Sequence, residues 1–147
     1  MLFWIPREGG TMSEANKQLM RRWFEEVWNQ RKELAIEAML TPGCRVHGLG
    51  GDAELIGPEG FKTFHRSFCG AFPDLRVAIH DTIAEGDRVA IRWTATMTHL
   101  GDGLGFPASG KNVSLDGSTI GVIKDGIIDE GWNYMDITGL FAKLKAA

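Results

Sequence analysis

The sequence predicts a single α+β domain in which helices come first and a curved, mixed or antiparallel sheet follows. Three observations favour this fold class. Apolar side chains recur at helical spacing in the first half of the chain, and apolar and polar residues alternate after residue 76, as they do in half-buried strands. The length of 147 residues suits one domain with its own core. Helices followed by a meander of strands are typical of α+β architecture.

The first helix is predicted over residues 13–30. Residues 1–12 precede it and are expected to form an N-terminal arm that is disordered or docks elsewhere, so that the folded domain spans residues 13–147. Charged residues separate the apolar positions, which gives the helix one apolar face. Its apolar residues are Leu19, Met20, Trp23, Phe24, Val27 and Trp28.

Two shorter helices are expected next, on either side of a short strand over residues 44–48. The segment 33–40 reads as a helix that Pro42 and Gly43 end. The following helix begins at Gly57-Pro58-Glu59, with proline at the first helical position and an acidic residue in the first turn. A glycine-rich loop over residues 48–52 precedes it. His65 lies on this third helix and is predicted at the surface.

Strands are predicted over residues 76–84, 88–100, 111–124 and 127–135, and a closing helix over 138–144. In the second of these strands Val89, Ile91, Trp93, Ala95 and Met97 share one face, opposite arginines and threonines. Asp125-Gly126 is a favoured two-residue hairpin turn. Because long twisted strands curl, the sheet should leave a concave side that the first helix closes into a cone.

Composition argues against several classes of partner. The net charge is −3, from 16 basic and 19 acidic residues, and no Lys/Arg cluster indicates a nucleic-acid surface. No apolar run approaches the ~20 residues that a membrane span needs. Cys44 and Cys69 are expected to be reduced thiols of a cytoplasmic protein. No His-x-His or Glu-x-x-His spacing is present, so no metal is expected.

Three motifs occur in order in the second half: Phe72-Pro73-Asp74-Leu75, Gly-x-Pro-x-x-Gly-Lys at 105–111, and the ending from Asp125-Gly126 to Gly139-Leu140. Together they resemble the SnoaL-like polyketide cyclase family of the nuclear-transport-factor-2-like superfamily, over residues 13–144. The resemblance implies a cone-shaped fold around a deep apolar pocket, and aldol cyclisation without a metal or organic cofactor. It also implies a homodimer formed through the outer face of the sheet.

The resemblance places an acid/base Asp on the last strand and a His on the strand before it, and both positions differ here. They fall on Asn133 and Thr119. A buried carboxylate exchanges protons near neutral pH, whereas an amide only donates and accepts hydrogen bonds. The cyclase mechanism is therefore not expected to operate unchanged. The polar candidates for catalysis are Asn133, His47 at the end of the first strand, and His99, which shares the parity of the apolar face of its strand.

The candidates for ligand binding are mostly aromatic, and the same side chains would also suit a plain core. One interpretation is an enzyme with cofactor-free acid/base chemistry, such as aldol cyclisation, isomerisation or hydration, on an apolar substrate. The alternatives are a non-catalytic carrier or sensor of an apolar ligand, and an interaction module. An enzyme needs a titratable group beside the ligand, whereas a carrier needs only shape and apolar lining. The candidates are Phe24, Trp28, Phe64, Phe68, Trp93, Met97, Phe106 and Thr119.

Overall fold

One curved, unclosed sheet of six strands organises the protein, in the order β2-β1-β6-β5-β4-β3. The computed structural model describes residues 5–49 and 53–147 and confirms the α+β prediction. The elements are α1 (Ile5–Arg22), the π-helix η1 (Trp23–Asn29), α2 (Glu33–Met39), β1 (Leu40–His47), β2 (Leu55–Ile56), α3 (Gly57–Ala71), β3 (Arg76–Glu85), β4 (Arg88–Thr98), β5 (Asn112–Lys124), β6 (Ile127–Met135) and α4 (Ile137–Lys145).

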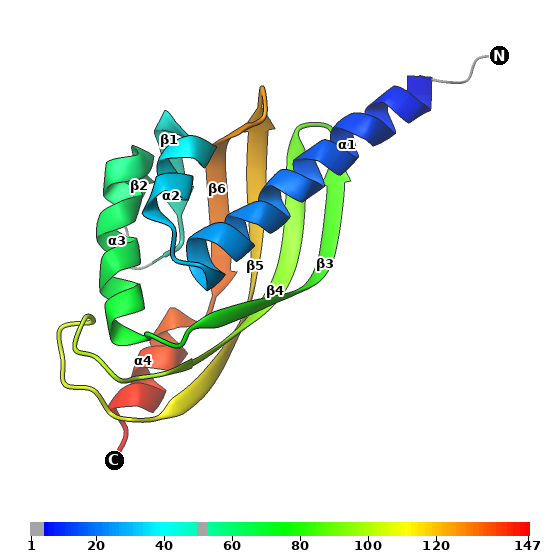
Figure 1. Cartoon of the computed structure of the whole chain (residues 1–147). Coiled ribbons are helices and arrows are strands. Elements are labelled where there is room, and N and C mark those ends of the chain that lie inside the picture. The colour runs from blue at the N-terminus through cyan, green and yellow to red at the C-terminus, as the bar shows by residue number, and fades with distance from the viewer. Residues whose placement is uncertain (1–4, 50–52) are drawn as a thin grey trace.

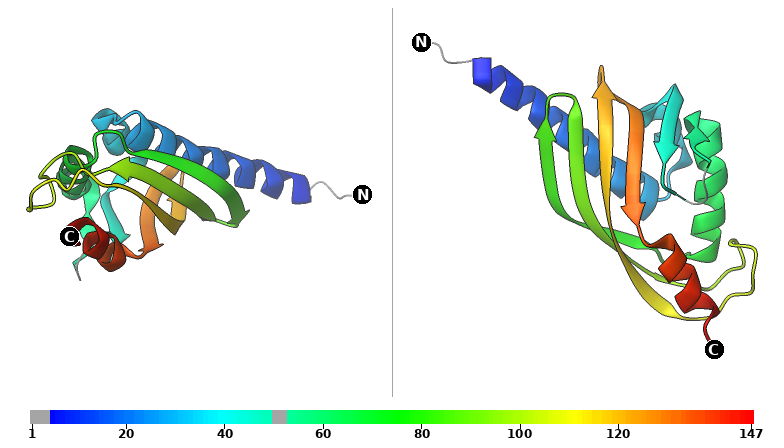
Figure 2. Two further views of the ribbon diagram at one scale, coloured as in Figure 1. Left: turned by 90° about the horizontal axis from the view of Figure 1, so that it is seen from below. Right: turned by 180° about the vertical axis from the view of Figure 1, so that it is seen from behind.

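The sheet is mixed, because β1 runs parallel to β6 while every other neighbouring pair is antiparallel. α1 and η1 cross its concave face, and α2 and α3 lie beside β1 and β2 (Figure 1). Seen from behind, strands β3 to β6 present their convex face, and no helix of the described segments lies across its middle (Figure 2). The concave side is therefore where helices and sheet enclose the core.

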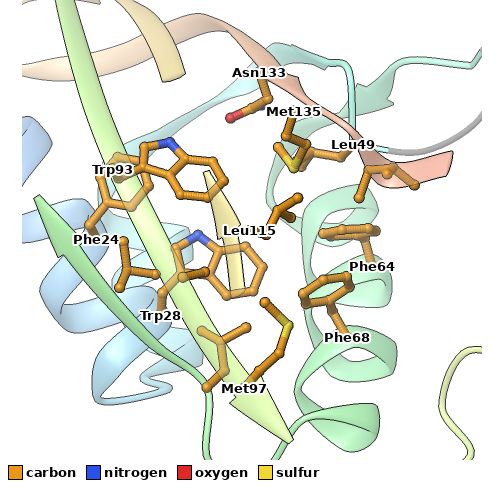
Figure 3. Close-up of a pocket in the computed structure, with 14 residues that line it drawn as sticks. Phe24, Trp28, Leu49, Phe64, Phe68, Trp93, Met97, Leu115, Asn133 and Met135 are labelled. Carbon is orange, nitrogen blue, oxygen red and sulfur yellow. The ribbon is translucent and has the colours of Figure 1, made fainter. Parts of the chain in front are cut away.

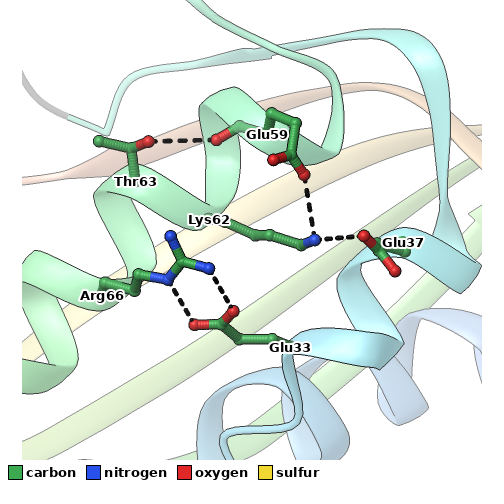
Figure 4. A network of polar contacts seen from close by, with 6 residues as sticks. All are labelled: Glu33, Glu37, Glu59, Lys62, Thr63 and Arg66. Atoms are coloured by element: carbon green, nitrogen blue, oxygen red, sulfur yellow. Dashed lines mark hydrogen bonds and ion pairs between the residues drawn. The ribbon is translucent and has the colours of Figure 1, made fainter.

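Ion pairs join α2 to α3 (Figure 4). The Lys62 ammonium binds the carboxylate of Glu37 and, at 3.0 Å, that of Glu59. Arg66 donates two hydrogen bonds to Glu33, with N–O distances of 2.8 and 2.7 Å. The parallel bonds of such a bidentate pair fix the relative orientation of the two helices. This contact helps to hold α3 against α2.

Alternation along β4 is as predicted, since Val89, Ile91, Trp93, Ala95 and Met97 are all buried on the inner face. The Asp125-Gly126 turn has positive φ at both residues, 52° and 76°, which is the backbone of a favoured hairpin turn. Among the described residues, every helix is too short or too polar to cross a lipid bilayer.

The first helix starts earlier and ends differently than predicted. It begins at Ile5, so the segment expected as an arm is helical from that residue, and residues 1–4 lie outside the described part. Gly9 and Gly10 disfavour a helix interior, which is why the pattern indicated a start at residue 13. The predicted final turns form the π-helix η1. β1 likewise starts at Leu40 and contains Pro42, where no ladder partner is recorded.

The prediction that His65 lies at the surface is wrong, because its side chain is only 2% exposed. Its Nε2 lies 2.7 Å from the carbonyl oxygen of Val27, and that oxygen belongs to the last turn of η1. The last carbonyls of a helix lack partners within the helix, so an imidazole N–H can satisfy one of them. Burial lowers the pKa of His65, which favours the neutral ring.

Candidate functional site

A pocket opens between the concave face of the sheet, η1 and α3 (Figure 3). It contains about 460 Å³ of space between atoms, part of it continuous with solvent. The lining is apolar with one exception, the amide of Asn133. The lining residues are Phe24, Trp28, Leu49, Phe64, Phe68, Leu75, Val77, Trp93, Ala95, Met97, Leu115, Asn133, Met135 and Ile137.

Two helices supply the aromatic side of the wall, each by its own periodicity. η1 brings Phe24 and Trp28 to the same cavity, and the rings of Phe64 and Phe68 come from successive turns of α3. The ring of Trp28 meets both α3 rings edge to face, at centroid distances of 6.2 and 6.0 Å. Edge-to-face contacts of this kind stabilise aromatic pairs beyond their burial. The wall is therefore a connected aromatic cluster.

A chain of hydrogen bonds fixes the Asn133 amide. The indole Nε1 of Trp93 donates to Thr119 Oγ1 at 3.0 Å, and the Thr119 hydroxyl donates to Asn133 Oδ1 at 2.8 Å. Asn133 Nδ2 then donates to the backbone oxygen of His47 at 3.0 Å. One end of the chain can only donate and the other can only accept, so the direction of every bond is determined.

Backbone geometry around Asn133 depends on Gly48. Its φ is +84°, and a Cβ atom there would lie 2.0 Å from the backbone oxygen of Asn133. Only glycine combines that conformation with such an approach. The end of β1 can therefore lie against β6, which is how the His47 oxygen reaches the amide. The rest of the predicted loop, residues 50–52, lies outside the described residues.

Seven of the fourteen lining residues are candidates from the sequence. Phe24, Trp28, Phe64, Phe68, Trp93 and Met97 line the pocket together with Asn133, whereas Thr119 lines a second cavity behind the amide. The other lining residues include Ala95, Leu115 and Met135, which lie on inward-facing strand positions. The alternation of apolar and polar residues along the strands predicts that these side chains face inward. It does not predict whether they lie at the pocket or elsewhere in the core.

His47 lies outside the pocket lining, and its ring points to a different cluster. Its Nε2 is 2.7 Å from Glu130 and its Nδ1 is 3.4 Å from Glu54, and the ring stacks on Trp132 at 5.5 Å. The hydrogen bond from His47 is the main cause that lowers the pKa of the Glu130 carboxyl. Only the backbone of His47 contacts the pocket amide.

His99 and Phe106 also lie outside the pocket lining. The His99 ring is fully buried, and its Nδ1 accepts the backbone N–H of Ser109 at 3.0 Å. Phe106 packs on that ring at 5.3 Å and lies under the ammonium of Lys145, which is 4.7 Å from the ring centroid. These contacts tie the loop over residues 101–110 to α4.

The electrostatics of the pocket follow from its lining. No Asp, Glu, His, Lys, Arg, Cys or Tyr belongs to it among the residues that the structure describes. Within the same described ranges, no group of three or more His, Cys, Asp or Glu side chains is arranged to hold a metal ion. The site can thus bury apolar surface and form hydrogen bonds to the amide, but its described walls supply no proton donor or acceptor for acid/base chemistry.

Residues 18–144 match the model of the family described as SnoaL-like polyketide cyclase. A solved structure from Jannaschia sp. CCS1, provisionally named as a SnoaL-like polyketide cyclase, is 25% identical with a TM-score of 0.83, covering 91% of this chain and 94% of that one. TsrD from Streptomyces laurentii is 29% identical, with a TM-score of 0.77 and coverages of 91% and 97%. A protein from Acidithiobacillus ferrooxidans, provisionally named as a polyketide cyclase, is 27% identical, with a TM-score of 0.75 and coverages of 89% and 94%. No curated protein matches the chain.

Proposed function

The chain belongs to the SnoaL-like polyketide cyclase family, and we propose that it binds an uncharged, apolar small molecule in the pocket without acid/base catalysis by the lining side chains. One observation carries the proposal: Asn133 is the single polar side chain in a described lining of fourteen residues that is otherwise apolar. Apolar walls with one oriented polar group are typical of sites that recognise a small molecule by shape and one hydrogen bond.

The amide and its relay argue for an anchoring role. Asn133 donates one N–H to His47 and accepts from Thr119, which leaves its second N–H without a partner in the described hydrogen bonds. That N–H can donate to a carbonyl or ether oxygen of a ligand. An amide side chain cannot take a proton from carbon. In enzymes, the loss of a general base commonly lowers the rate by about 100- to 10,000-fold. Binding is therefore better supported than catalysis.

A series of naphthalene derivatives tests the proposal by tryptophan fluorescence, because Trp28 and Trp93 both line the pocket. Acetylnaphthalene should bind several-fold more tightly than ethylnaphthalene, which lacks the carbonyl, and Asn133→Leu should abolish the difference. An acetylnaphthalene that also carries a carboxylate should bind much more weakly, since the lining offers its charge no partner.

Two matched variants on β4 locate the binding. Ala95 faces the pocket and Ala90 faces the opposite side of the strand. Ala95→Leu should weaken the binding of every compound in the series, and Ala90→Leu should not. Equal effects of both variants, or no binding of any compound, would refute the proposal. Chemical conversion of a bound ketone by the native protein that Asn133→Leu removes would instead favour cyclase-type catalysis.

A further inference from the structure

A second cavity lies directly behind the pocket, on the other side of Asn133. It contains about 390 Å³ of space between atoms, part of it continuous with solvent. We call the pocket of Figure 3 the front chamber and this second cavity the rear chamber. The rear chamber is lined by Met20, Trp23, Trp28, Leu40, Val46, Leu49, Phe61, Thr119, Gly121, Ile128, Gly131 and Asn133.

The two chambers share three lining residues, Trp28, Leu49 and Asn133. These side chains border both chambers, so the two chambers meet at them. Apart from indole N–H groups, the polar side chains of both described linings are confined to Asn133 and its hydrogen-bond partner Thr119. The polar groups therefore lie at the junction, and each chamber extends away from them along apolar walls.

We propose that the two chambers form one site for an uncharged ligand with two apolar lobes joined at a hydrogen-bond acceptor, such as a diaryl ketone. The acceptor lies at the junction and receives the second N–H of Asn133, while one lobe fills each chamber. The inference rests on the proposed function, and it adds a second binding subsite and the shape of the ligand. Uncharged lobes are required because the described walls of neither chamber carry an ionisable side chain.

Glycines on two strands keep the rear chamber open. Gly121 on β5 and Gly131 on β6 are register partners, so their missing side chains leave adjacent space. A Cβ atom on Gly121 would lie 2.9 Å from the Met20 sulfur. A Cβ atom on Gly131 would meet only the backbone oxygen of Ile120, at 3.8 Å, which is an ordinary contact. A methyl group at Gly131 therefore enters the chamber without displacing the fold.

The test compares two ketones on the full-length protein. Acetylnaphthalene has one aromatic lobe, and benzoylnaphthalene carries a second lobe across the same carbonyl. We expect benzoylnaphthalene to bind about tenfold or more tightly, because a second ring leaves water for an apolar cavity. Gly131→Ala should reduce this ratio of affinities to about twofold or less by occupying the rear chamber. Val46→Leu, which adds volume to the rear chamber from β1, should reduce the ratio in the same direction.

Ala95→Leu is the matched front-chamber variant, and it should lower both affinities while leaving the ratio high. Thermal unfolding of each variant checks that the fold is retained. The subsite is refuted if the two ketones bind equally well to the native protein, or if neither rear-chamber variant changes the ratio while both remain folded. In those cases binding of acetylnaphthalene still supports the front pocket. If neither ketone binds, the proposed function fails and this inference fails with it.

Discussion

Replacing Asn133 by Asp tests whether the hydrogen bonds run from Thr119 through the Asn133 amide to the His47 carbonyl. The substitution keeps the shape of the side chain and exchanges its NH₂ group for an oxygen. The Thr119 hydroxyl can still donate to one carboxylate oxygen across 2.8 Å. The other oxygen would face the carbonyl oxygen of His47 at the present 3.0 Å, and two acceptors repel unless a proton lies between them.

The protonated acid should therefore be favoured in the folded variant. An apolar pocket and an acceptor-only neighbour both raise the pKa of a carboxyl group, so the folded pKa should lie above the unfolded one. In that case the variant is close to native stability near about pH 4, where roughly half of the unfolded Asp is still protonated. The free energy of unfolding of the variant then falls below that of the native protein as the pH rises through the folded pKa. We expect this loss of stability to reach about 1–3 kcal/mol, which is the cost of leaving one buried polar contact unsatisfied.

Urea unfolding of both proteins between pH 4 and pH 8 measures this difference at each pH. Asn112→Asp is the control, because Asn112 is exposed at the start of β5 and its amide donates to Thr98 outside the pocket. A carboxylate in the pocket should also deprotonate nitrobenzisoxazole, about 100-fold faster than the native protein does. A stability difference that does not change with pH, together with no gain in this reaction, would refute the assigned direction of the relay.

Three further changes test other parts of the structure. Thr119→Val should cost about 1–3 kcal/mol in urea unfolding because the Trp93 indole N–H loses its acceptor, and Thr119→Ser should restore most of it; equal losses in both variants would contradict this account. The lowered pKa of His65 means that the unfolded chain binds the proton more readily, so its contribution to stability is present above about pH 6.5 and is lost as the pH falls. His65→Gln should therefore lose less stability than the native protein between pH 7.5 and pH 5, and an unchanged slope would count against the buried neutral ring. Asp136→Ala should lower the free energy of unfolding by about 1 kcal/mol because the carboxylate accepts the backbone N–H of Gly139 at the start of α4, and Asp136→Asn should recover part of the loss.

The fold was largely predictable from local pattern. Alternation in β4 identified the inner face residue by residue, and Asp125-Gly126 identified its hairpin, because both signals depend on neighbours in sequence. Pro58 and Glu59 marked the start of α3 for the same reason. The π-helix η1 was not predictable, since an amphipathic pattern does not distinguish it from an α-helix.

The candidate site was predictable only in part. Asn133 and Thr119 were found because the order of motifs placed both on neighbouring strands, and they are cross-strand partners in the structure. His47 ends β1 as predicted and His99 directly follows the end of β4, but their rings lie in other environments, one against Glu130 and one among aromatic rings. The direction of a side chain at a strand end depends on what packs against that end.

The sequence by itself determined the α+β class, the apolar inner face of the sheet, and the presence of an amide at position 133 of the last strand, because each depends on residue identity and short-range periodicity. Tertiary structure alone decided that His65 is buried against η1, that Trp93 and Thr119 orient the amide, and that Trp28 and Leu49 line both chambers. Each of these is a contact between segments far apart in the chain. Periodicity gives the direction of a side chain, whereas the curvature of the sheet and the packing of α1, η1 and α3 decide what it meets.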